Sequence, residues 1–308
     1  MPFAHEFDLH TANEIKKYCR RQKIDLVHAH SAHSHALAVL ADLRGNNLAI
    51  ILSRRVDFPV KNNWLSRYKY NYPGIKKIIC VSDKIKEVLA PALKQPEKCV
   101  TIHSGIDLNR FEDSYRSGKL HEELQLPLST FLIGNVSAIA PHKDYFTFVD
   151  TAAQLLNQDL DAKFLIIGDG PSRPEIEAYV AQKNLQKSIL FLGFRQDIPA
   201  ILSELDVFLI TSETEGLGTT ILDAFACHVP VVATAGGGIP EIVKQNKTGM
   251  LAAVRDAEML ATHVLNVLTI GTLRTRLIEN ATQFLTEFTK EKTAQKTIAV
   301  YQEVLKSK

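Results

Sequence analysis

Acidic, glycine and threonine residues gather in the segment 212–227, which reads S-E-T-E-G-L-G-T-T-I-L-D-A-F-A-C. It follows an apolar run typical of a strand (207–210) and leads into a helical pattern, so we expect it at the carboxyl end of a parallel strand, where open α/β sheets bind ligands. Glu215 lies just before this helix and Asp223 just over one turn inside it. This spacing can bring both carboxylates to one pocket, where groups that only accept hydrogen bonds suit the hydroxyls of sugars and ribose.

The residues between the two carboxylates suit an anion. Gly216 and Gly218 allow a ligand to approach the backbone closely. Thr219 and Thr220 can cap the helix, whose exposed N–H groups would attract a phosphate. The alternative is an ordinary capped helix with solvated acidic side chains, because short motifs often match by chance.

Further candidates lie in loops that follow expected strands. Lys143, in A-P-H-K-D-Y (140–145), could place a fixed cation beside a departing diphosphate, or could be an ordinary exposed loop lysine. Gly168, in G-D-G-P, and the G-G-G turn at 236–238 also follow strand patterns. Each turn fits either a ligand contact or a plain strand–helix connection.

Four histidines cluster at the end of another expected strand: His28, His30, His33 and His35. Their spacing, H-x-H-x2-H-x-H, matches no standard zinc pattern. No carboxylate cluster is spaced for Mg²⁺ either, so no metal site and no metal cofactor are predicted.

The composition is that of an ordinary globular protein. The 308 residues include 36 Lys and Arg against 34 Asp and Glu, and 45% are hydrophobic, which excludes disorder, collagen and coiled coil. No apolar run reaches the ~18 residues that a membrane span needs, and the N-terminus lacks the basic and apolar regions of a signal peptide. Four scattered cysteines predict neither disulfides nor zinc. We expect a reduced, cytoplasmic α/β enzyme.

Short apolar runs alternate with helical patterns along the whole chain, which predicts doubly wound parallel sheets. The length fits two Rossmann-like domains, and the polar stretch 110–127 is the expected boundary, giving domains over residues 1–120 and 121–289. The first strand pattern begins only at Leu26, and no Gly-rich turn precedes it. The first domain is therefore expected to be truncated, lacking an opening strand and its loop.

The spacing of Glu215 and Asp223 resembles the E-x7-E signature of the retaining glycosyltransferases of family 4 (glycosyl transferases group 1), which have the GT-B fold. Asp replaces the second Glu, which shortens its reach by one methylene. Further segments look like landmarks of this family, in order along the chain: D-L-V-H-A-H (25–30), I-I-C-V-S-D (78–83), V-T-I-H-S-G-I-D-L-N-R-F (100–111), F-L-I-I-G-D-G-P (164–171), I-L-F-L-G-F (189–194), V-P-V-V-A-T-A-G-G-G-I-P-E-I-V (229–243) and A-V-Y-Q-E-V-L (299–305).

The resemblance implies that the C-terminal domain binds a nucleotide-diphosphate sugar and the N-terminal domain binds the acceptor. Glu215 would contact the transferred sugar, Lys143 the diphosphate and Asp223 the ribose. His30 matches the family histidine that lies beside the donor sugar. The remaining donor-binding candidates are Gly168, Gly193, Phe194, Arg195, Gly216, Leu217, Gly218, Thr219 and Thr220.

Two further features follow from the same resemblance. The family often carries an Arg five residues before the lysine, where this chain has Ala138, so Arg195 or Lys247 would have to supply a second cation. Residues 290–308 would form a helix that crosses back to the N-terminal domain.

The segment 54–77 concentrates basic residues with Trp64 and three tyrosines. Such a surface suits an anionic bilayer or a polyanionic acceptor. Its alternative is an aromatic packing helix with Lys and Arg side chains extended along it. No nucleic-acid module is visible, so nucleic acid is not an expected partner.

Taken together, these features predict a retaining, metal-independent glycosyltransferase, of hexosyl or N-acetylhexosaminyl type, in polysaccharide biosynthesis. The expected donor is a UDP- or GDP-sugar and the expected acceptor a glycan or a lipid-linked molecule. The expected location is the cytoplasm, with peripheral association with the inner membrane as an option. The alternative is a catalytically impaired nucleotide-sugar-binding protein, because of the truncated N-terminal domain. A sugar-nucleotide epimerase is disfavoured by the spacing of Glu215 and Asp223.

Overall fold

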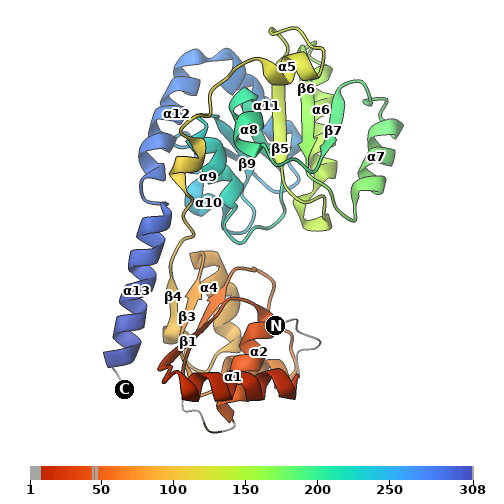
Figure 1. Cartoon of the computed structure of the whole chain (residues 1–308). Helices are drawn as coiled ribbons and strands as arrows, with labels where there is room; N and C mark the ends of the chain where they lie inside the picture. Colours follow the sequence, from red (N-terminus) through yellow and green to blue (C-terminus); the bar gives the residue numbers. More distant parts are fainter. Residues whose placement is uncertain (1–7, 44, 46–47, 307–308) are drawn as a thin grey trace. The chain divides into compact units, whose positions relative to one another are not determined.

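The computed structural model describes residues 8–43, 45 and 48–306 (Figure 1). The chain divides into two compact units. The first unit comprises Met1–Ser104 and Glu291–Lys308, and the second comprises Gly105–Lys290.

The first unit contains a four-stranded parallel sheet in the order β1-β2-β3-β4. Its strands are β1 (Leu26–Ala29), β2 (Ala49–Arg54), β3 (Ile75–Cys80) and β4 (Cys99–Thr101). Its helices are α1 (Leu9–Arg21), α2 (Ala32–Leu43), α3 (Trp64–Tyr70), α4 (Asp83–Leu89) and α13 (Lys290–Lys306), with 3-10 turns η1 (Ala90–Ala92) and η2 (Pro96–Lys98). Polar residues cap several of these helices: Asp8 caps α1, Asn63 caps α3 and Ser82 caps α4.

The C-terminal helix α13 covers one face of this sheet (Figure 1). Val300 and Val304 pack against Ile51 and Ile79 in one buried apolar cluster. A parallel sheet needs apolar cover on both faces, and the end of the chain supplies part of it here.

The second unit contains a six-stranded parallel sheet in the order β10-β9-β8-β5-β6-β7. Its strands are β5 (Phe131–Val136), β6 (Ala162–Ile167), β7 (Ile189–Gly193), β8 (Val207–Ile210), β9 (Val231–Thr234) and β10 (Met250–Ala252). Taken from β7 to β10, the sequence order within the sheet is that of a Rossmann domain, with its topological switch point between β5 and β8.

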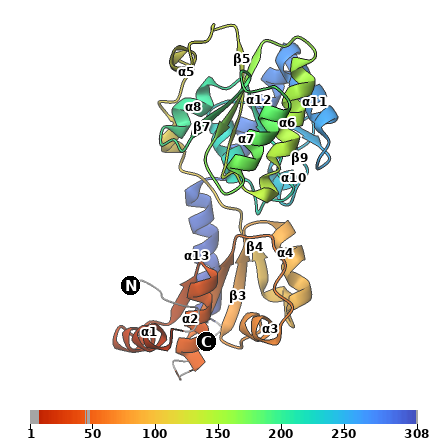
Figure 2. The same ribbon diagram turned by 90° about the vertical axis from the view of Figure 1, so that its right-hand side faces the viewer.

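Helices and 3-10 turns connect these strands. They are η3 (Leu108–Phe111), α5 (Lys119–Glu123), η4 (Pro141–Lys143), α6 (Tyr145–Leu156), α7 (Arg173–Gln182), α8 (Ile198–Glu204), α9 (Thr219–Ala226), α10 (Ile239–Ile242), α11 (Ala257–Thr269) and α12 (Gly271–Leu285). Figure 2 shows α6 and α7 on one face of the sheet, where they share a buried core with α11. Phe148, Phe164 and Val264 are fully buried in that core.

The boundary between the units differs from the expected one. The polar stretch 110–118 belongs to the second unit, because its side chains and backbone are bound there. Arg116 Nη1 lies 2.5 Å from Asp206 Oδ1, and the backbone N–H groups of Ser117 and Gly118 donate to the carboxylate of Glu204. Polarity alone suggested a domain boundary here, whereas the buried carboxylates of Glu204 and Asp206 bind this stretch to the second unit.

The expected absence of an opening strand and Gly-rich loop concerns residues before Ala12. Residues 1–7 lie outside the described part of the chain. From Leu9 onward the chain forms α1, and β1 follows at Leu26.

Candidate active site

The switch point of the second sheet brings two sequence candidates together. The chain leaves β5 at Val136 and runs through η4 to Lys143, and it leaves β8 at Ile210 and runs to Glu215. Since β5 and β8 are parallel neighbours, both segments emerge at the same edge of the sheet. Ligands of doubly wound sheets bind at this place.

Lys143 and Glu215 form an ion pair at this edge. The Lys143 Nζ and Glu215 Oε1 atoms are 2.5 Å apart, and the two side chains are only 15% and 11% exposed. The fully buried Ser212 donates its hydroxyl to the same oxygen at 2.8 Å. The Glu215 carboxylate is therefore held by both Lys143 and Ser212. Among the described ion pairs, Glu215 is the one carboxylate that Lys143 contacts.

The loop that carries Lys143 is fixed to β8. Asp144 has the left-handed backbone conformation (φ 45°) and caps α6 by accepting a bond from the Thr147 N–H at 3.2 Å. The buried Thr211 hydroxyl contacts the carbonyl oxygens of Lys143 at 3.2 Å and Asp144 at 2.9 Å. These contacts fix the backbone at Lys143 and Asp144, from which the lysine side chain reaches Glu215.

The glycine turn at 236–238 supports the backbone of Glu215. A Cβ atom on Gly237 would lie 2.2 Å from the Glu215 carbonyl oxygen, and a Cβ on Gly236 would lie 2.4 Å from that of Ser212. The Gly238 N–H donates to the Glu215 carbonyl at 2.8 Å. These glycines permit a close backbone approach that positions the carboxylate, a role that the sequence left open.

The start of α9 differs from the capping expectation. The N-cap residue is Gly218, in the left-handed conformation (φ 81°), and no side chain caps the helix. Thr219 and Thr220 are the first two residues of the helix. Their hydroxyls are therefore not at the N-cap position, from which a side chain accepts a hydrogen bond from the N–H groups of the first turn. Leu217 is buried, so its side chain is not accessible to a ligand. Uncapped N–H groups of this kind favour an anion.

Asp223 lies in α9, and burial raises the pKa of its carboxyl to about 6. The cation of Arg110, in η3, opposes that shift by lowering the pKa. No described residue donates a hydrogen bond to this carboxylate. Arg110 was not identified from the sequence, because the fold of the polar segment onto the second unit brings it there.

The remaining donor-binding candidates lie at the ends of β6 and β7. The Gly168 N–H donates to the Gly193 carbonyl at 2.8 Å, and both glycines have positive φ. Phe194 is 79% exposed. Arg195 is bound to Glu123 at 2.5 Å and to Asp197 at 2.7 Å, which raises its pKa. Its guanidinium is therefore engaged by two carboxylates.

His30 belongs to the first unit and follows β1. Its ring lies 3.9 Å from the ring of His28, centroid to centroid. His28 is held by the Tyr301 hydroxyl at 2.5 Å from Nδ1 and the Ser53 hydroxyl at 2.8 Å from Nε2. Burial, with the positive charge of Arg55 and of His30, lowers the pKa of His28 to about 4, and burial and Arg55 also lower that of His30. The His28 ring is therefore neutral at neutral pH.

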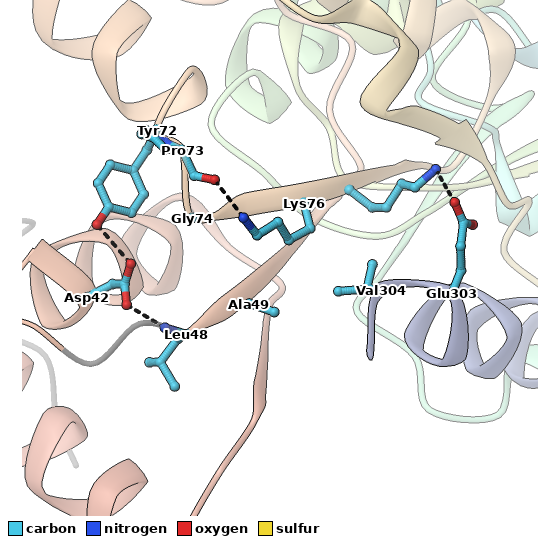
Figure 3. A pocket seen from close by; sticks show the side chains of 10 residues that line it. Asp42, Leu48, Ala49, Tyr72, Pro73, Gly74, Lys76, Glu303 and Val304 are labelled. Atoms are coloured by element: carbon cyan, nitrogen blue, oxygen red, sulfur yellow. Dashed lines mark hydrogen bonds and ion pairs between the residues drawn. The ribbon is translucent and has the colours of Figure 1, made fainter. Parts of the chain in front are cut away.

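A cavity of about 530 Å³ lies elsewhere in the first unit, at the amino ends of β2 and β3 (Figure 3). Its polar groups bind one another. Asp42 accepts from the Tyr72 hydroxyl at 2.8 Å and the Leu48 N–H at 2.6 Å, and Lys77 lies 2.8 Å from Glu303. The cavity is thus at the opposite ends of the strands from His30, and its contacts support the fold.

The basic and aromatic segment forms α3 and its flanks. Trp64 is 78% exposed, and Phe58 and Tyr68 are also exposed. Among the residues that the structure describes, no helix has the length and apolar character needed to cross a membrane.

Comparisons with known families agree with this architecture. A model described as "Glycosyl transferases group 1" matches residues 117–284, and one described as "Glycosyltransferase Family 4" matches residues 2–110. The first match covers more than half of the chain, including Lys143, Glu215 and Asp223.

Curated relatives carry the likeness further. An N-acetyl-alpha-D-glucosaminyl L-malate synthase of Bacillus anthracis is 26% identical, with 97% of this chain and 80% of the relative covered. A UDP-Gal:alpha-D-GlcNAc-diphosphoundecaprenol alpha-1,3-galactosyltransferase of Escherichia coli is 28% identical over 82% of this chain and 68% of its own length.

Solved structures match the fold of the chain. A glycosyltransferase from Rickettsia africae has a TM-score of 0.85 at 23% identity, covering 100% of this chain and 85% of that one. The Anabaena protein Alr3699/HepE, in complex with UDP-glucose, has a TM-score of 0.84 at 21% identity, covering 95% and 82%. The chain therefore has the GT-B fold and belongs to the group 1 glycosyltransferases of the family 4 type.

Proposed function

We propose that the chain is a retaining glycosyltransferase that moves a hexosyl or N-acetylhexosaminyl group from a UDP- or GDP-sugar to a glycan or lipid-linked acceptor. The observation that carries the proposal is the buried pair of Lys143 and Glu215 beside the uncapped start of α9. A cation and free N–H groups suit a diphosphate, and a carboxylate suits sugar hydroxyls.

In this proposal the donor diphosphate lies on the first turn of α9 and meets Lys143. As the bond between the anomeric carbon and the phosphate oxygen breaks, negative charge grows on the departing diphosphate, and Lys143 stabilises it. The acceptor hydroxyl attacks the anomeric carbon from the same face, and its proton passes to the leaving phosphate oxygen. The configuration at the anomeric carbon is thereby retained.

The two carboxylates have separate roles. Glu215 accepts hydrogen bonds from hydroxyls of the transferred sugar. The Ser212 hydroxyl holds the Glu215 carboxylate in position by donating to it. Asp223 accepts from the ribose diol, which would supply the hydrogen bonds that its buried carboxylate does not receive from described residues. Gly168 and the segment from Gly193 to Arg195 would border the nucleotide base.

No metal cofactor is needed in this proposal, because Lys143 and the helix terminus supply the positive charge that a metal would otherwise supply. The test is activity in the presence and absence of a chelator. Equal rates support a metal-independent reaction, and a loss restored by Mg²⁺ or Mn²⁺ contradicts it.

The relatives support the donor and acceptor classes. The printed name of the E. coli relative specifies UDP-galactose and a diphosphoundecaprenol-linked acceptor, and HepE was crystallised with UDP-glucose. On this support we propose that the chain acts in polysaccharide or lipid-linked glycan assembly, with UDP-sugars as the first donors to test.

We further propose that the chain works in the cytoplasm and associates peripherally with the inner membrane face. Its four cysteines are all buried free thiols, as suits a reducing compartment. Trp64 is exposed beside Lys61 and Arg67, a combination suited to an anionic bilayer. Binding to anionic vesicles should fall when Lys61, Arg67 and Lys69 are changed to Glu, and unchanged binding refutes the membrane proposal.

A thermal-shift panel of UDP- and GDP-sugars tests the donor site. A true donor at ~100 times its dissociation constant should add about 2.7 kcal/mol of stability. Lys143→Ala should reduce that gain, whereas Lys187→Ala, which removes an exposed lysine of the same unit, should not. A flat panel refutes donor binding. If a donor raises the melting temperature but no product forms with any of a broad set of acceptors, the alternative of a catalytically impaired nucleotide-sugar-binding protein is favoured.

A further inference from the structure

A cavity of about 290 Å³ lies at the carboxyl ends of β1 and β2 in the first unit. Its lining includes His30 and Ser31, which follow β1, and Ser53, Arg54 and Arg55 at the end of β2. Ligands of open parallel sheets bind at this edge. The cavity thus has the position of a binding site in its own unit.

The lining of this cavity is cationic. Two guanidinium groups, those of Arg54 and Arg55, border it, and no Asp or Glu is among its lining residues. A cavity with positive charge and no carboxylate favours an anionic ligand.

The two arginines differ in their freedom. Arg54 donates to the Tyr70 hydroxyl at 2.5 Å and to the Phe58 carbonyl, and its charge lies over the Tyr70 ring at 5.5 Å. Its Nε is buried without a hydrogen-bond partner. Arg55 is exposed and forms no hydrogen bond or ion pair with a described residue, yet its charge lowers the pKa of His28 and His30. Arg55 therefore stands near the imidazoles with its donors unused.

The start of α2 adds to the positive potential. Ser31 and Ala32 line the cavity, and Ser31 accepts a hydrogen bond from the Ser34 N–H at 3.1 Å as the helix begins. The positive end of a twelve-residue helix dipole therefore borders the same space as the guanidinium groups. The start of α2 and the two arginine side chains therefore both favour a negatively charged ligand.

We infer that this cavity binds an acidic group of the acceptor, a phosphate or a carboxylate, through Arg55 and the start of α2. The inference rests on the proposed glycosyltransferase function and names the class of acceptor: a hydroxyl compound that carries a negative charge. A forked guanidinium matches either acid, because both present paired oxygens. His30, which also lines the cavity, is then the neighbour of the bound anion.

The test titrates small probes into the full chain with UDP at saturation, so that the donor phosphate site is occupied. The probes are glycerol 3-phosphate, L-malate and, as the neutral control, glycerol. Binding is measured by calorimetry and by the NMR signals of the His30 ring. We expect at least one anion to bind and to raise the His30 pKa, while glycerol does neither. The preferred probe identifies phosphate or carboxylate as the acid.

Variants separate this site from general charge effects. Arg55→Ala should weaken binding of the anion by about tenfold or more, which is the loss of affinity expected when a charge-assisted hydrogen bond is removed. Arg55→Lys should recover part of that loss. Arg21→Ala, which removes an exposed arginine of α1 away from this cavity, should leave affinity within about twofold.

Two results overturn the inference: neither anion binds, or Arg55→Ala and Arg21→Ala weaken binding equally. UDP affinity is measured on each protein in the same series. If UDP binds and the anions do not, the acceptor inference fails and the donor site stands; if neither UDP nor GDP binds, the proposed function itself fails.

Discussion

The ammonium of Lys143 and the carboxylate of Glu215 lie 2.5 Å apart, at the ends of two neighbouring parallel strands. Each is largely buried, so each depends on the other for compensation of its charge. In the proposed reaction the lysine must also serve the diphosphate. In that proposal the pair is both a structural contact and a preformed part of the donor site.

Lys143→Ala is expected to lower kcat by about 10²- to 10³-fold, the usual effect of losing one donor to a developing oxyanion. It should also lower the free energy of unfolding, on the order of 3 kcal/mol, because a buried carboxylate loses its counter-charge. Urea unfolding and steady-state kinetics measure both. The double variant Lys143→Met with Glu215→Gln should regain stability without regaining activity. Activity close to that of the parent in either protein contradicts the assignment.

Asp223 should produce a pH-dependent difference in stability. Its pKa is about 6 in the folded chain and near 4 when unfolded, so the folded chain binds more protons between these values. Its contribution to the free energy of unfolding therefore falls as pH rises through this window, by at most about 1.4 kcal/mol per pH unit. Asp223→Asn should remove that slope. Urea titrations of parent and variant from about pH 4 to 7 should diverge, and parallel curves would refute the shift.

The same carboxylate should control nucleotide affinity. UDP should bind less tightly to the parent as pH falls below about 6, because a protonated Asp223 accepts fewer hydrogen bonds from ribose. Asp223→Asn should be weaker at neutral pH and less dependent on pH over this range. Calorimetry at several pH values measures this, with 2′,3′-dideoxy-UDP as a ligand whose affinity should not depend on Asp223.

Gly237→Ala should disturb Glu215 without touching its side chain. The added Cβ would lie 2.2 Å from the Glu215 carbonyl oxygen, at a φ of 58° that Ala rarely adopts. We expect a loss of a few kcal/mol of stability, together with weaker donor binding. Gly271→Ala is the matched control, because Gly271 is the first residue of α12 and a Cβ atom there would meet nothing within 4 Å. It should be neutral or slightly stabilising, and an equal effect of both changes would count against the role of the turn.

Tyr301→Phe should affect His28, which is 273 residues away in the sequence but in direct contact with Tyr301. It removes the hydroxyl 2.5 Å from His28 Nδ1, which should cost about 1 kcal/mol and shift the ring signals of His28 and His30 in NMR spectra. Glu303→Gln weakens a partly exposed ion pair between the same helix and Lys77, so it should change stability by less than about 1 kcal/mol and leave those signals in place. Identical spectra for parent and Tyr301→Phe would show that α13 does not influence His30.

Much of the fold follows from local patterns. The apolar run at 207–210 is β8 with the expected bounds, because a strand buried on both faces carries uninterrupted apolar residues. The parallel, two-sheet α/β organisation and the family were confirmed. The individual residue roles stay predictions, since the variants above are what test them.

The details of the site depend on contacts between distant segments. Lys143 and Glu215 are 72 residues apart, and only the pairing of β5 with β8 makes them neighbours. The support that Gly237 gives to Glu215 depends on a backbone approach that composition does not reveal. The polar stretch after Arg110 has the composition of a linker, yet Glu204 fastens it to the second unit.

Both ends of the chain complete the first unit, whereas the second is one continuous segment. During synthesis, the segment from Gly105 to Lys290 can therefore acquire its core as soon as it leaves the ribosome. The sheet formed earlier must wait, with Ile51 and Ile79 still uncovered, until translation delivers Val300 and Val304. The unit that is begun first is thus completed last, and a chain cut before Val300 would leave the apolar face at Ile51 and Ile79 uncovered.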